Sequence, residues 1–282
     1  MIQNALTVDV EDYFHVSAFA DAIKRSDWDA CQLRVENNTQ RLLDLFDTHG
    51  ISATFFVLGW VAERLPELVE EISNRGHEVA CHGYSHQLVY NQKPRDFRDE
   101  TLRARDLLED IIQRPVRGYR AASYSITEQS RWALDILVEA GFVYDSSIFP
   151  VRHDRYGIPG APEHPHVLET PAGHRLVEFP LSTVKLFGIC LPIAGGGYFR
   201  LYPYALSRSG LRHINRNNRP FIFYLHPWEI DTEQPRVSAD WLSRFRHYNN
   251  LRRCETRLQR LLADFRFGTV EQVLETQGLL QG

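Results

Sequence analysis

Short apolar runs alternate with segments of helical period through the first half of the chain. Apolar runs at residues 5–10, 51–59, 77–83, 118–125 and 142–147 predict strands. Between them, helices are predicted at residues 39–49, 61–75, 94–113 and 128–140, the second of which is interrupted by Pro66. Residues 13–36 lack a clear period and are expected to form a loop with a short helical piece. Strands and helices that alternate at this pace indicate a parallel sheet or an α/β barrel.

The second half of the chain has a weaker pattern. Residues 150–175 are rich in Pro, Gly and His and are expected to form a long surface loop. A β-rich stretch, the glycines 195–197, a buried strand at 220–226 and a basic helix at 249–265 follow. A chain of 282 residues has the size of one decorated α/β barrel. We therefore expect a single domain over residues 1–282, with a core of about residues 1–230 and a C-terminal extension of about residues 231–282.

Composition narrows the function classes. The net charge is −4 and the pI is about 6.3, which gives no indication of nucleic-acid binding. The four cysteines, at positions 31, 81, 190 and 254, are far apart, which argues against a disulfide framework and against zinc held by cysteines. The sequence contains no apolar run of membrane-spanning length, and its first residues do not resemble a signal peptide. We therefore expect a cytoplasmic protein, of an oligomeric state that the sequence leaves open.

Ionisable side chains stand at the carboxyl ends of four predicted strands. They are Asp9, Glu11 and Asp12 after the first strand, His82 and His86 at the third, Arg120 at the fourth, and His226 at the end of FIFYLH. In an α/β barrel these strand ends meet at one mouth, so we expect the side chains to lie together. Two imidazoles four residues apart on a helix or turn can converge on one ion. A carboxylate as third ligand would leave positions open for water and substrate.

Each of these signals has an ordinary structural explanation when it is taken alone. An HxxxH pair is often two surface histidines, a lone His226 is often a buried residue bonded to a carbonyl, and an acidic cluster is often a solvated loop. The coincidence of such residues at four strand ends favours a functional site. In that site Arg120 can pair with Asp9 and keep it ionised, and His226 can protonate a leaving amine.

Several segments resemble one known family along nearly the whole chain. They are TVDVEDYF (7–14), TFFVLGWVAER (54–64), GHEVACHGYSH (76–86), RGYRAASYSI (117–126), YDSSIFP (144–150), AGGGYFRLYPYAL (194–206) and FYLHPWEID (223–231). The family is that of the polysaccharide deacetylases of the NodB-homology type, or carbohydrate esterase family 4. The resemblance is strongest to the branch associated with exopolysaccharide and exosortase loci. It implies a distorted (β/α) barrel with added loops and a C-terminal helical extension.

The resemblance also implies an activity and roles for individual residues. A divalent metal, zinc or else cobalt, nickel or iron, would be held by His82, His86 and one carboxylate, and N-acetyl groups would be removed from N-acetylhexosamine units of a polysaccharide or oligosaccharide. Asp9 would be the general base, oriented by Arg120, and His226 the general acid. The backbone amide of Tyr124 would stabilise the oxyanion. The family motif has two adjacent aspartates, so the run Asp9-Val10-Glu11-Asp12 leaves either Glu11 or Asp12 as the third ligand.

Other positions bear on the substrate and on alternative functions. Tyr198, which follows three glycines that would let a loop approach a ligand closely, is expected to contact substrate, as are Asp145 and Trp228. Ala122 stands where the family usually has a proline that would stiffen the loop. That departure is the only support for a carbohydrate-binding relative without strong catalysis. A hydrolase of small cyclic amides or imides on the same barrel is the other alternative.

Overall fold

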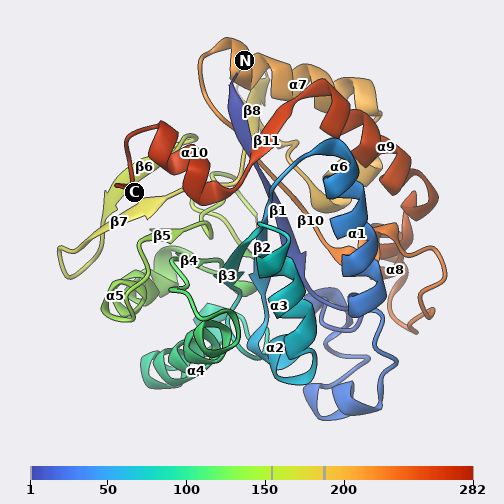
Figure 1. Ribbon diagram of the computed structural model, residues 1–282, viewed down its shortest axis with the longest axis horizontal. Helices are drawn as coiled ribbons and strands as arrows, with labels where there is room; N and C mark the ends of the chain where they lie inside the picture. The colour runs from blue at the N-terminus through green and yellow to red at the C-terminus, as the bar shows by residue number, and fades with distance from the viewer. Residues whose placement is uncertain (1, 154, 187–188, 282) are drawn as a thin grey trace.

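Parallel strands form the centre of the molecule, in the order β10-β1-β2-β3-β4-β5-β7-β6, with β11 also paired to β1 (Figure 1). The computed structural model describes residues 2–153, 155–186 and 189–281. The strands are β1 (Gln3–Val10), β2 (Thr54–Val57), β3 (Glu78–Cys81), β4 (Gly118–Tyr119), β5 (Tyr144–Asp145), β6 (His166–Glu169), β7 (Arg175–Glu178), β10 (Ile222–Leu225) and β11 (Arg266–Gly268). Within this sheet the β6–β7 pair is antiparallel, whereas the other pairs are parallel. β8 (Thr183–Leu186) and β9 (Ile189–Pro192) form a separate antiparallel pair.

Helices lie between successive strands and cover the outside of the sheet (Figure 1). They are α1 (Val35–His49), α2 (Gly59–Arg64), α3 (Pro66–Asn74), α4 (Pro94–Ile112), α5 (Trp132–Glu139), α6 (Gly196–Leu201), α7 (Tyr204–Arg216), α8 (Trp241–Tyr248), α9 (Leu251–Asp264) and α10 (Val270–Thr276). The predicted α/β fold with a parallel sheet is therefore confirmed. In the part of the chain that the structure describes, no helix is long and apolar enough to cross a bilayer.

Alternation along β1 decides which of its side chains face the interior of the barrel. Leu6, Val8 and Val10 belong to the large core under the helices, whereas Ala5 belongs to a second core inside the sheet. Because successive side chains of a strand point to opposite faces, Thr7 and Asp9 share the inner face with Ala5. A polar side chain is thereby held inside the barrel near the carboxyl end of β1.

The C-terminal segment adds a strand to the sheet and a helix to the inner core. β11 pairs in parallel with β1, with Gln3 opposite Arg266. The α10 side chains Val270 and Val273 belong to the inner core, and the Val270 amide donates to Thr54 Oγ1 at the start of β2. The predicted helical extension thus contains a strand, and α10 packs against the amino ends of the strands, opposite the end that carries the ionisable cluster.

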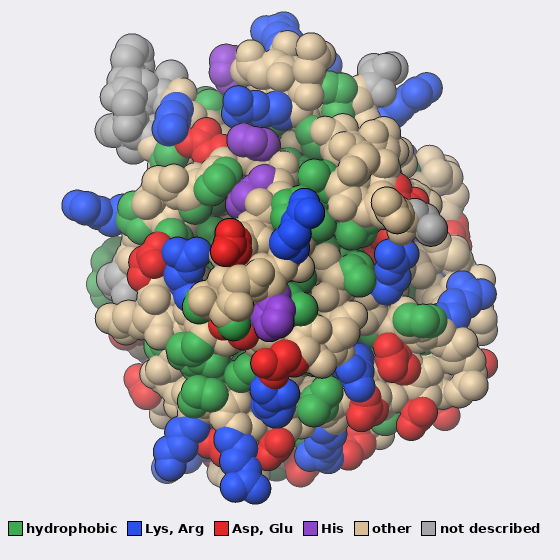
Figure 2. All heavy atoms as spheres, turned by 90° about the vertical axis from the view of Figure 1, so that its left-hand side faces the viewer, with side chains coloured by type: hydrophobic (Ala, Val, Ile, Leu, Met, Phe, Trp, Pro, Cys, Tyr) green, Lys and Arg blue, Asp and Glu red, His purple; other side chains and the backbone are tan. Residues whose placement is uncertain are grey.

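The weakest predictions lie where the apolar pattern was least regular. The segment expected to be a long loop at 150–175 contains β6, and α6, α7 and α8 were not predicted. The first helix begins at Val35 instead of near Thr39, because the Asp12 carboxylate accepts hydrogen bonds from the amides of Arg34 and Val35. Figure 2 shows the face beside β6, β7 and α5, where basic and acidic side chains are interspersed.

Candidate active site

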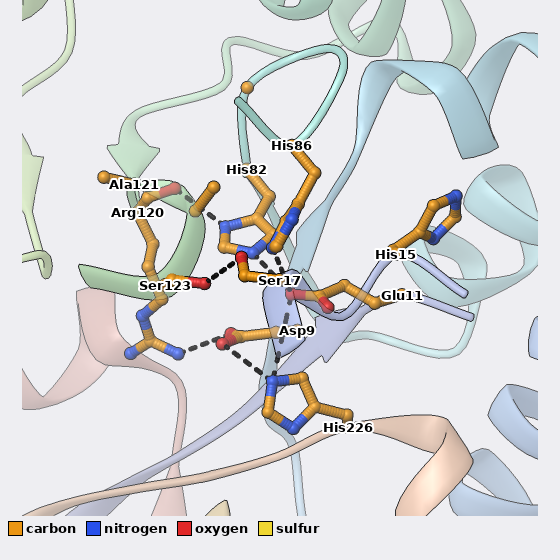
Figure 3. Close-up of polar contacts among 12 residues, drawn as sticks. Asp9, Glu11, His15, Ser17, His82, His86, Arg120, Ala121, Ser123 and His226 are labelled. Carbon is orange, nitrogen blue, oxygen red and sulfur yellow. Dashed lines mark hydrogen bonds and ion pairs between the residues drawn. The ribbon is translucent and has the colours of Figure 1, made fainter. Parts of the chain in front are cut away.

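The ionisable side chains predicted from the strand ends do meet at the carboxyl end of the sheet. Figure 3 shows them pointing toward a common centre; they are Asp9, Glu11, His82, His86, Arg120 and His226. Asp9 lies near the end of β1 and Glu11 just beyond it, while the others follow β3, β4 and β10. Arg120 is wholly buried, and of the histidine side chains that of His226 is the most exposed, at 17%. The cluster is thus enclosed on most sides and open beside His226.

Glu11 and two histidines form a compact set of metal-binding atoms. Glu11 Oε1 lies 2.9 Å from His82 Nε2 and 3.1 Å from His86 Nε2. Ligands on one tetrahedral zinc ion lie about 3.4 Å apart when each metal–ligand bond is about 2.1 Å. Burial alone would raise the pKa of Glu11, but the charges of His86 and His226 and the hydrogen bond from His82 hold that pKa well below its usual range. The carboxylate is therefore ionised and suited to a cation.

The two histidines are prepared for a ligand role by their other contacts. His82 Nδ1 lies 2.8 Å from the Arg120 carbonyl oxygen, which fixes the ring and leaves Nε2 as the lone-pair nitrogen. His86 Nε2 is buried, and among the described residues it has no aligned hydrogen-bond partner although Glu11 is near. Binding a cation would give this buried nitrogen the polar partner that it lacks. The residues present therefore fit a divalent metal.

Of the two possibilities that the spacing left open, a helix or a turn, the HxxxH pair converges through a turn. His82 follows β3 directly, and the chain then turns back, with Gly83 and His86 in the left-handed region at φ 73° and 51°. The carbonyls of Gly83 and Tyr84 accept the first amides of α2, from Gly59 and Trp60. The loop that carries His86 is therefore anchored on a helix N-terminus.

The structure distinguishes between the two carboxylates left open by the sequence. Glu11 reaches both imidazoles, whereas Asp12 turns away from them. Asp12 Oδ2 accepts the amides of Arg34 and Val35 at 2.6 and 2.8 Å, and Oδ1 accepts the amide of Tyr13 at 2.9 Å. Since both of its oxygens serve backbone groups, two of them at the start of α1, the inclusion of Asp12 among the metal ligands is corrected.

Asp9 is held by a buried guanidinium. Arg120 Nη1 donates to Asp9 Oδ1 at 2.6 Å and to Thr7 Oγ1 at 2.8 Å. The remaining donors of Arg120 bond to the carbonyl and hydroxyl oxygens of Ser146, at 3.2 and 3.0 Å. This arrangement leaves Asp9 Oδ2 directed toward the cluster, 3.9 Å from His226 Nε2. An ionised carboxylate in this position can accept a proton from a bound water.

His226 has a carboxylate partner that the sequence reasoning did not name. Glu229 Oε1 lies 2.9 Å from His226 Nδ1, and Glu229 Oε2 accepts from Arg200 Nε at 2.6 Å. Burial alone would lower the pKa of His226, but the charges of Glu11, Glu229 and Asp9 outweigh it and raise that pKa to about 9. The spacing His-Pro-Trp-Glu, with a carboxylate three residues after a possible helix cap, was the available signal for Glu229.

Arg200 links this histidine to the C-terminal helices. The guanidinium is buried and also donates to the carbonyl oxygens of His247 and Asn249, at 2.7 and 2.9 Å, between α8 and α9. The Trp228 ring is stacked between His226 and His247, with centroid distances of 5.0 and 4.1 Å. The region after residue 230 thus positions the His226 side chain.

The Tyr124 backbone amide, which is the expected oxyanion donor, is already engaged in a backbone hydrogen bond. Ser123 and Tyr124 both have left-handed backbone conformations, at φ 50° and 55°, and the Tyr124 amide donates to the Ala121 carbonyl at 3.0 Å. The assignment of that amide as a free oxyanion donor is therefore corrected. The Tyr124 hydroxyl, 3.5 Å from Asp9 Oδ2, is the part of this residue that reaches the cluster.

Of the three predicted substrate contacts, Asp145 and Trp228 are enclosed within the protein, and Tyr198 is half-buried. Asp145 is fully buried and accepts a hydrogen bond from Ser147 Oγ at 2.5 Å, and the Trp228 ring is covered by the stacked rings of His226 and His247, so neither presents a surface to a sugar. Tyr198 is half-buried, with its hydroxyl 3.1 Å from that of Tyr156. Gly195 and Gly196 serve packing against β10, since a Cβ at Gly195 would lie 2.1 Å from the Tyr224 carbonyl oxygen and one at Gly196 would lie 2.7 Å from the Tyr224 ring.

Two family models divide the chain. Residues 26–143 match the model described as polysaccharide deacetylase, and residues 146–275 match a domain of unknown function, DUF3473. Together they contain most of the site, with His82 and Arg120 in the first segment and His226 in the second. Strands from both segments pair with β1, so the two matched segments contribute to one sheet and one site.

Curated relatives match a part of the chain. A peptidoglycan-N-acetylglucosamine deacetylase from Bacillus cereus is 31% identical over 98 residues, which are 34% of this chain and 36% of the relative. A peptidoglycan deacetylase from Helicobacter pylori is 33% identical over 38% of this chain and 36% of its own length. A chitooligosaccharide deacetylase from a Bradyrhizobium species is 31% identical over 35% and 43%. The chain thus spans less than half the length of these relatives.

Solved structures share the fold over nearly the whole chain. A putative polysaccharide deacetylase from Mycobacterium smegmatis has a TM-score of 0.63 at 20% identity and covers 99% of this chain and 92% of its own. The allantoinase Puue has a TM-score of 0.61 at 14% identity, with coverage of 99% and 91%. At these identities the likeness shows the fold alone. The family model places residues 26–143 in the polysaccharide deacetylase family, and the solved structures show that nearly the whole chain shares one fold.

Proposed function

We propose that this protein is a metal-dependent N-deacetylase that hydrolyses the acetamide of N-acetylhexosamine units in an exopolysaccharide. The observation that carries the proposal is the meeting of a three-residue metal set, Glu11, His82 and His86, with a carboxylate and a histidine on its open side. The carboxylate, Asp9, has a fixed counter-charge in Arg120. A pure sugar-binding protein has no need of this combination.

A divalent cation bound by Glu11, His82 and His86 would polarise the acetamide carbonyl and lower the pKa of a bound water. Asp9 Oδ2 accepts a proton from the attacking water, while Arg120 holds the other carboxylate oxygen in place. The water oxygen forms a bond to the acetyl carbon. The Tyr124 hydroxyl, which lies beside Asp9, can donate to developing negative charge.

Collapse of the tetrahedral adduct requires a proton on the amide nitrogen. His226 Nε2 faces Asp9 and Glu11 at 3.9 and 3.8 Å and is the acid best placed to supply it. The Glu229 carboxylate at Nδ1 stabilises the protonated ring. The carbon–nitrogen bond then breaks, acetate leaves, and the sugar keeps a free amine.

Acetate release from chitotetraose, an N-acetylglucosamine tetramer, tests the proposal. The zinc-loaded protein is expected to release acetate, and treatment with a chelator is expected to abolish the release until metal is restored. Asp9→Asn should retain the metal, because this substitution leaves Glu11, His82 and His86 in place, yet lose at least about a hundredfold in turnover. Release that is unaffected by chelation, or a fully active Asp9→Asn variant, would contradict the mechanism. Turnover of a cyclic amide in place of chitotetraose would favour the alternative hydrolase.

A further inference from the structure

A cavity adjoins the metal-binding cluster on the side of His86. Its volume is about 390 Å³, within the range of about 300–1,000 Å³ that is usual for small-molecule sites. The residues that matter for its chemistry are Phe14, His15, Lys24, Arg25, Trp28 and His86. Most of them come from the segment between β1 and α1, which includes the short helices η1 (Ser17–Phe19) and η2 (Arg25–Ala30). The proposed reaction uses none of these residues except His86.

Aromatic rings form a firm wall on one side of this cavity. The His15 ring lies 4.4 Å from both Phe14 and Trp28, centroid to centroid, and Trp28 lies 5.5 Å from Trp60. Phe14, His15 and Trp28 are almost entirely buried, so this wall is rigid and presents only a small part of each ring to the cavity. A sugar ring presents apolar C–H faces that pack against such rings, while its edge carries polar groups.

The same wall contains a buried donor that lacks a partner. His15 Nδ1 accepts the amide of Asp12 at 2.9 Å, so the ring proton resides on Nε2 when the imidazole is neutral. His15 Nε2 is buried and, within the described ranges, has no hydrogen-bond partner. Figure 3 shows the ring turned away from Asp9 and Glu11, so it does not serve the metal cluster. A hydroxyl or carboxylate oxygen in the cavity would satisfy this donor.

The charged residues that line the cavity are both basic. Lys24 and Arg25 line the cavity and are exposed to solvent, and no aspartate or glutamate is among the described residues that line it. Glu100 attracts Arg25 from nearby but does not line the cavity, and its oxygens accept the Ser85 hydroxyl at 2.7 and 2.8 Å. Two cations beside a neutral donor favour an anion, because charge-assisted hydrogen bonds are the strong ones.

The cavity lies next to the candidate active site. His86 belongs to the lining of the cavity and to the metal cluster. Ser17, which also lines the cavity, has its hydroxyl 2.7 Å from that of Ser123, next to Tyr124 (Figure 3). A sugar unit in the cavity would therefore be the neighbour of a unit whose acetamide lies at the metal.

From this arrangement we infer that the cavity binds an anionic sugar unit, a hexuronic acid or a similarly carboxylated hexose, adjacent in the chain to the N-acetylhexosamine that is deacetylated. The apolar sugar face would lie on the aromatic wall, and the carboxylate would bind Lys24 and Arg25. The inference rests on the proposed deacetylase function and names its substrate class: an acidic heteropolymer in place of a neutral N-acetylglucosamine polymer.

Calorimetric titration with two tetrasaccharides tests this assignment. One alternates glucuronic acid with N-acetylglucosamine, and the other is the neutral chitotetraose. Wild-type protein is expected to bind the acidic tetrasaccharide at least about tenfold more tightly at low salt, and to lose most of that preference in about 0.5 M salt. The double variant Lys24→Ala/Arg25→Ala should lose the preference, while Arg253→Ala/Arg260→Ala, with the same charge change on exposed positions of α9, should keep it.

The outcomes separate this inference from the function on which it rests. Equal affinity of the wild type for both tetrasaccharides, or an unchanged preference in Lys24→Ala/Arg25→Ala, would overturn the assignment of the cavity. All titrations use protein that carries Asp9→Asn and is otherwise as named, so that neither tetrasaccharide is turned over and binding decides the matter even where no acetate is released. Circular dichroism and melting temperature of each variant report whether the fold is retained. A lost preference in a variant with native melting supports the site.

Discussion

Replacing Arg120 with methionine removes the counter-charge of Asp9 while keeping a side chain of similar length. Arg120 is fully buried, and its guanidinium bonds to Asp9, Thr7 and Ser146. Methionine has none of these donors, so the buried Asp9 carboxylate would lose its ion pair. Removing one partner of a buried ion pair costs about 3–5 kcal/mol. We expect Arg120→Met to lower the free energy of unfolding by that amount.

A matched control and a second variant make this prediction specific. Arg41 pairs with Glu255 at the surface, with side chains 47% and 41% exposed, so Arg41→Met should cost only about 0–1 kcal/mol. Asp9→Asn/Arg120→Met should recover part of the loss, because a neutral amide in the same place needs no counter-charge. Urea unfolding followed by circular dichroism at about pH 7 measures each value.

Two results would refute the reasoning. The first is an Arg120→Met variant that is no less stable than Arg41→Met, which would mean that the Asp9 carboxylate does not depend on Arg120. The second is strict additivity of the Asp9→Asn and Arg120→Met effects in the double variant, since residues in direct contact are expected to be coupled.

Three further predictions concern the metal, the acid and the pH dependence of stability. His82→Ala should lose bound zinc by at least about tenfold in elemental analysis, and full occupancy would exclude His82 as a ligand. Arg200 holds Glu229, the carboxylate partner of His226, so Arg200→Met should lower kcat for acetate release by about tenfold or more with little change in KM. Arg200→Lys should restore part of the lost kcat. Equal changes in kcat and KM would indicate a merely structural role. Burial raises the pKa of Glu78 to about 6, so its contribution to stability is present below about pH 4.5 and is lost as the pH rises through 6. Relative to Glu78→Gln, the wild type should therefore lose about 2 kcal/mol between about pH 4.5 and 7 in urea unfolding, and parallel curves would contradict this.

The fold and the meeting of strand ends could be predicted because both follow from local periodicity. Alternation along β1 sends Asp9 to the inner face, and parallel strands bring His82, Arg120 and His226 to one end. Both features depend only on the order of apolar and polar residues along the chain. Both predictions are correct here because the apolar runs are short and end at polar residues, as at Asp9 and His226.

The remaining assignments depended on contacts between distant segments. Asp12 and Glu11 are adjacent in sequence, and only the position of α1 shows that Asp12 caps that helix. Asp145 is expected from the sequence to contact substrate, yet it is enclosed with Glu178, and the pKa values of both are raised by burial. The Tyr124 amide is engaged because two consecutive residues take left-handed conformations, which no local rule predicts for Ser and Tyr.

The carboxylate behind His226 is an intermediate case. Glu229 stands three residues after His226, at capping-box spacing, so it was within reach of sequence reasoning. Arg200, its buried partner, comes from α6, which the apolar pattern did not indicate. Its role depends on packing between α6 and α9, which only the folded chain provides.

The central claim is that Glu11, His82 and His86 hold one divalent cation beside Asp9. Anomalous diffraction from crystals of the zinc-loaded protein measures this directly. We expect one strong peak about 2.0–2.2 Å from Glu11 Oε1 and from the Nε2 atoms of His82 and His86. A peak bound by Asp12, or a zinc-loaded crystal without density between the two imidazoles, would contradict the account.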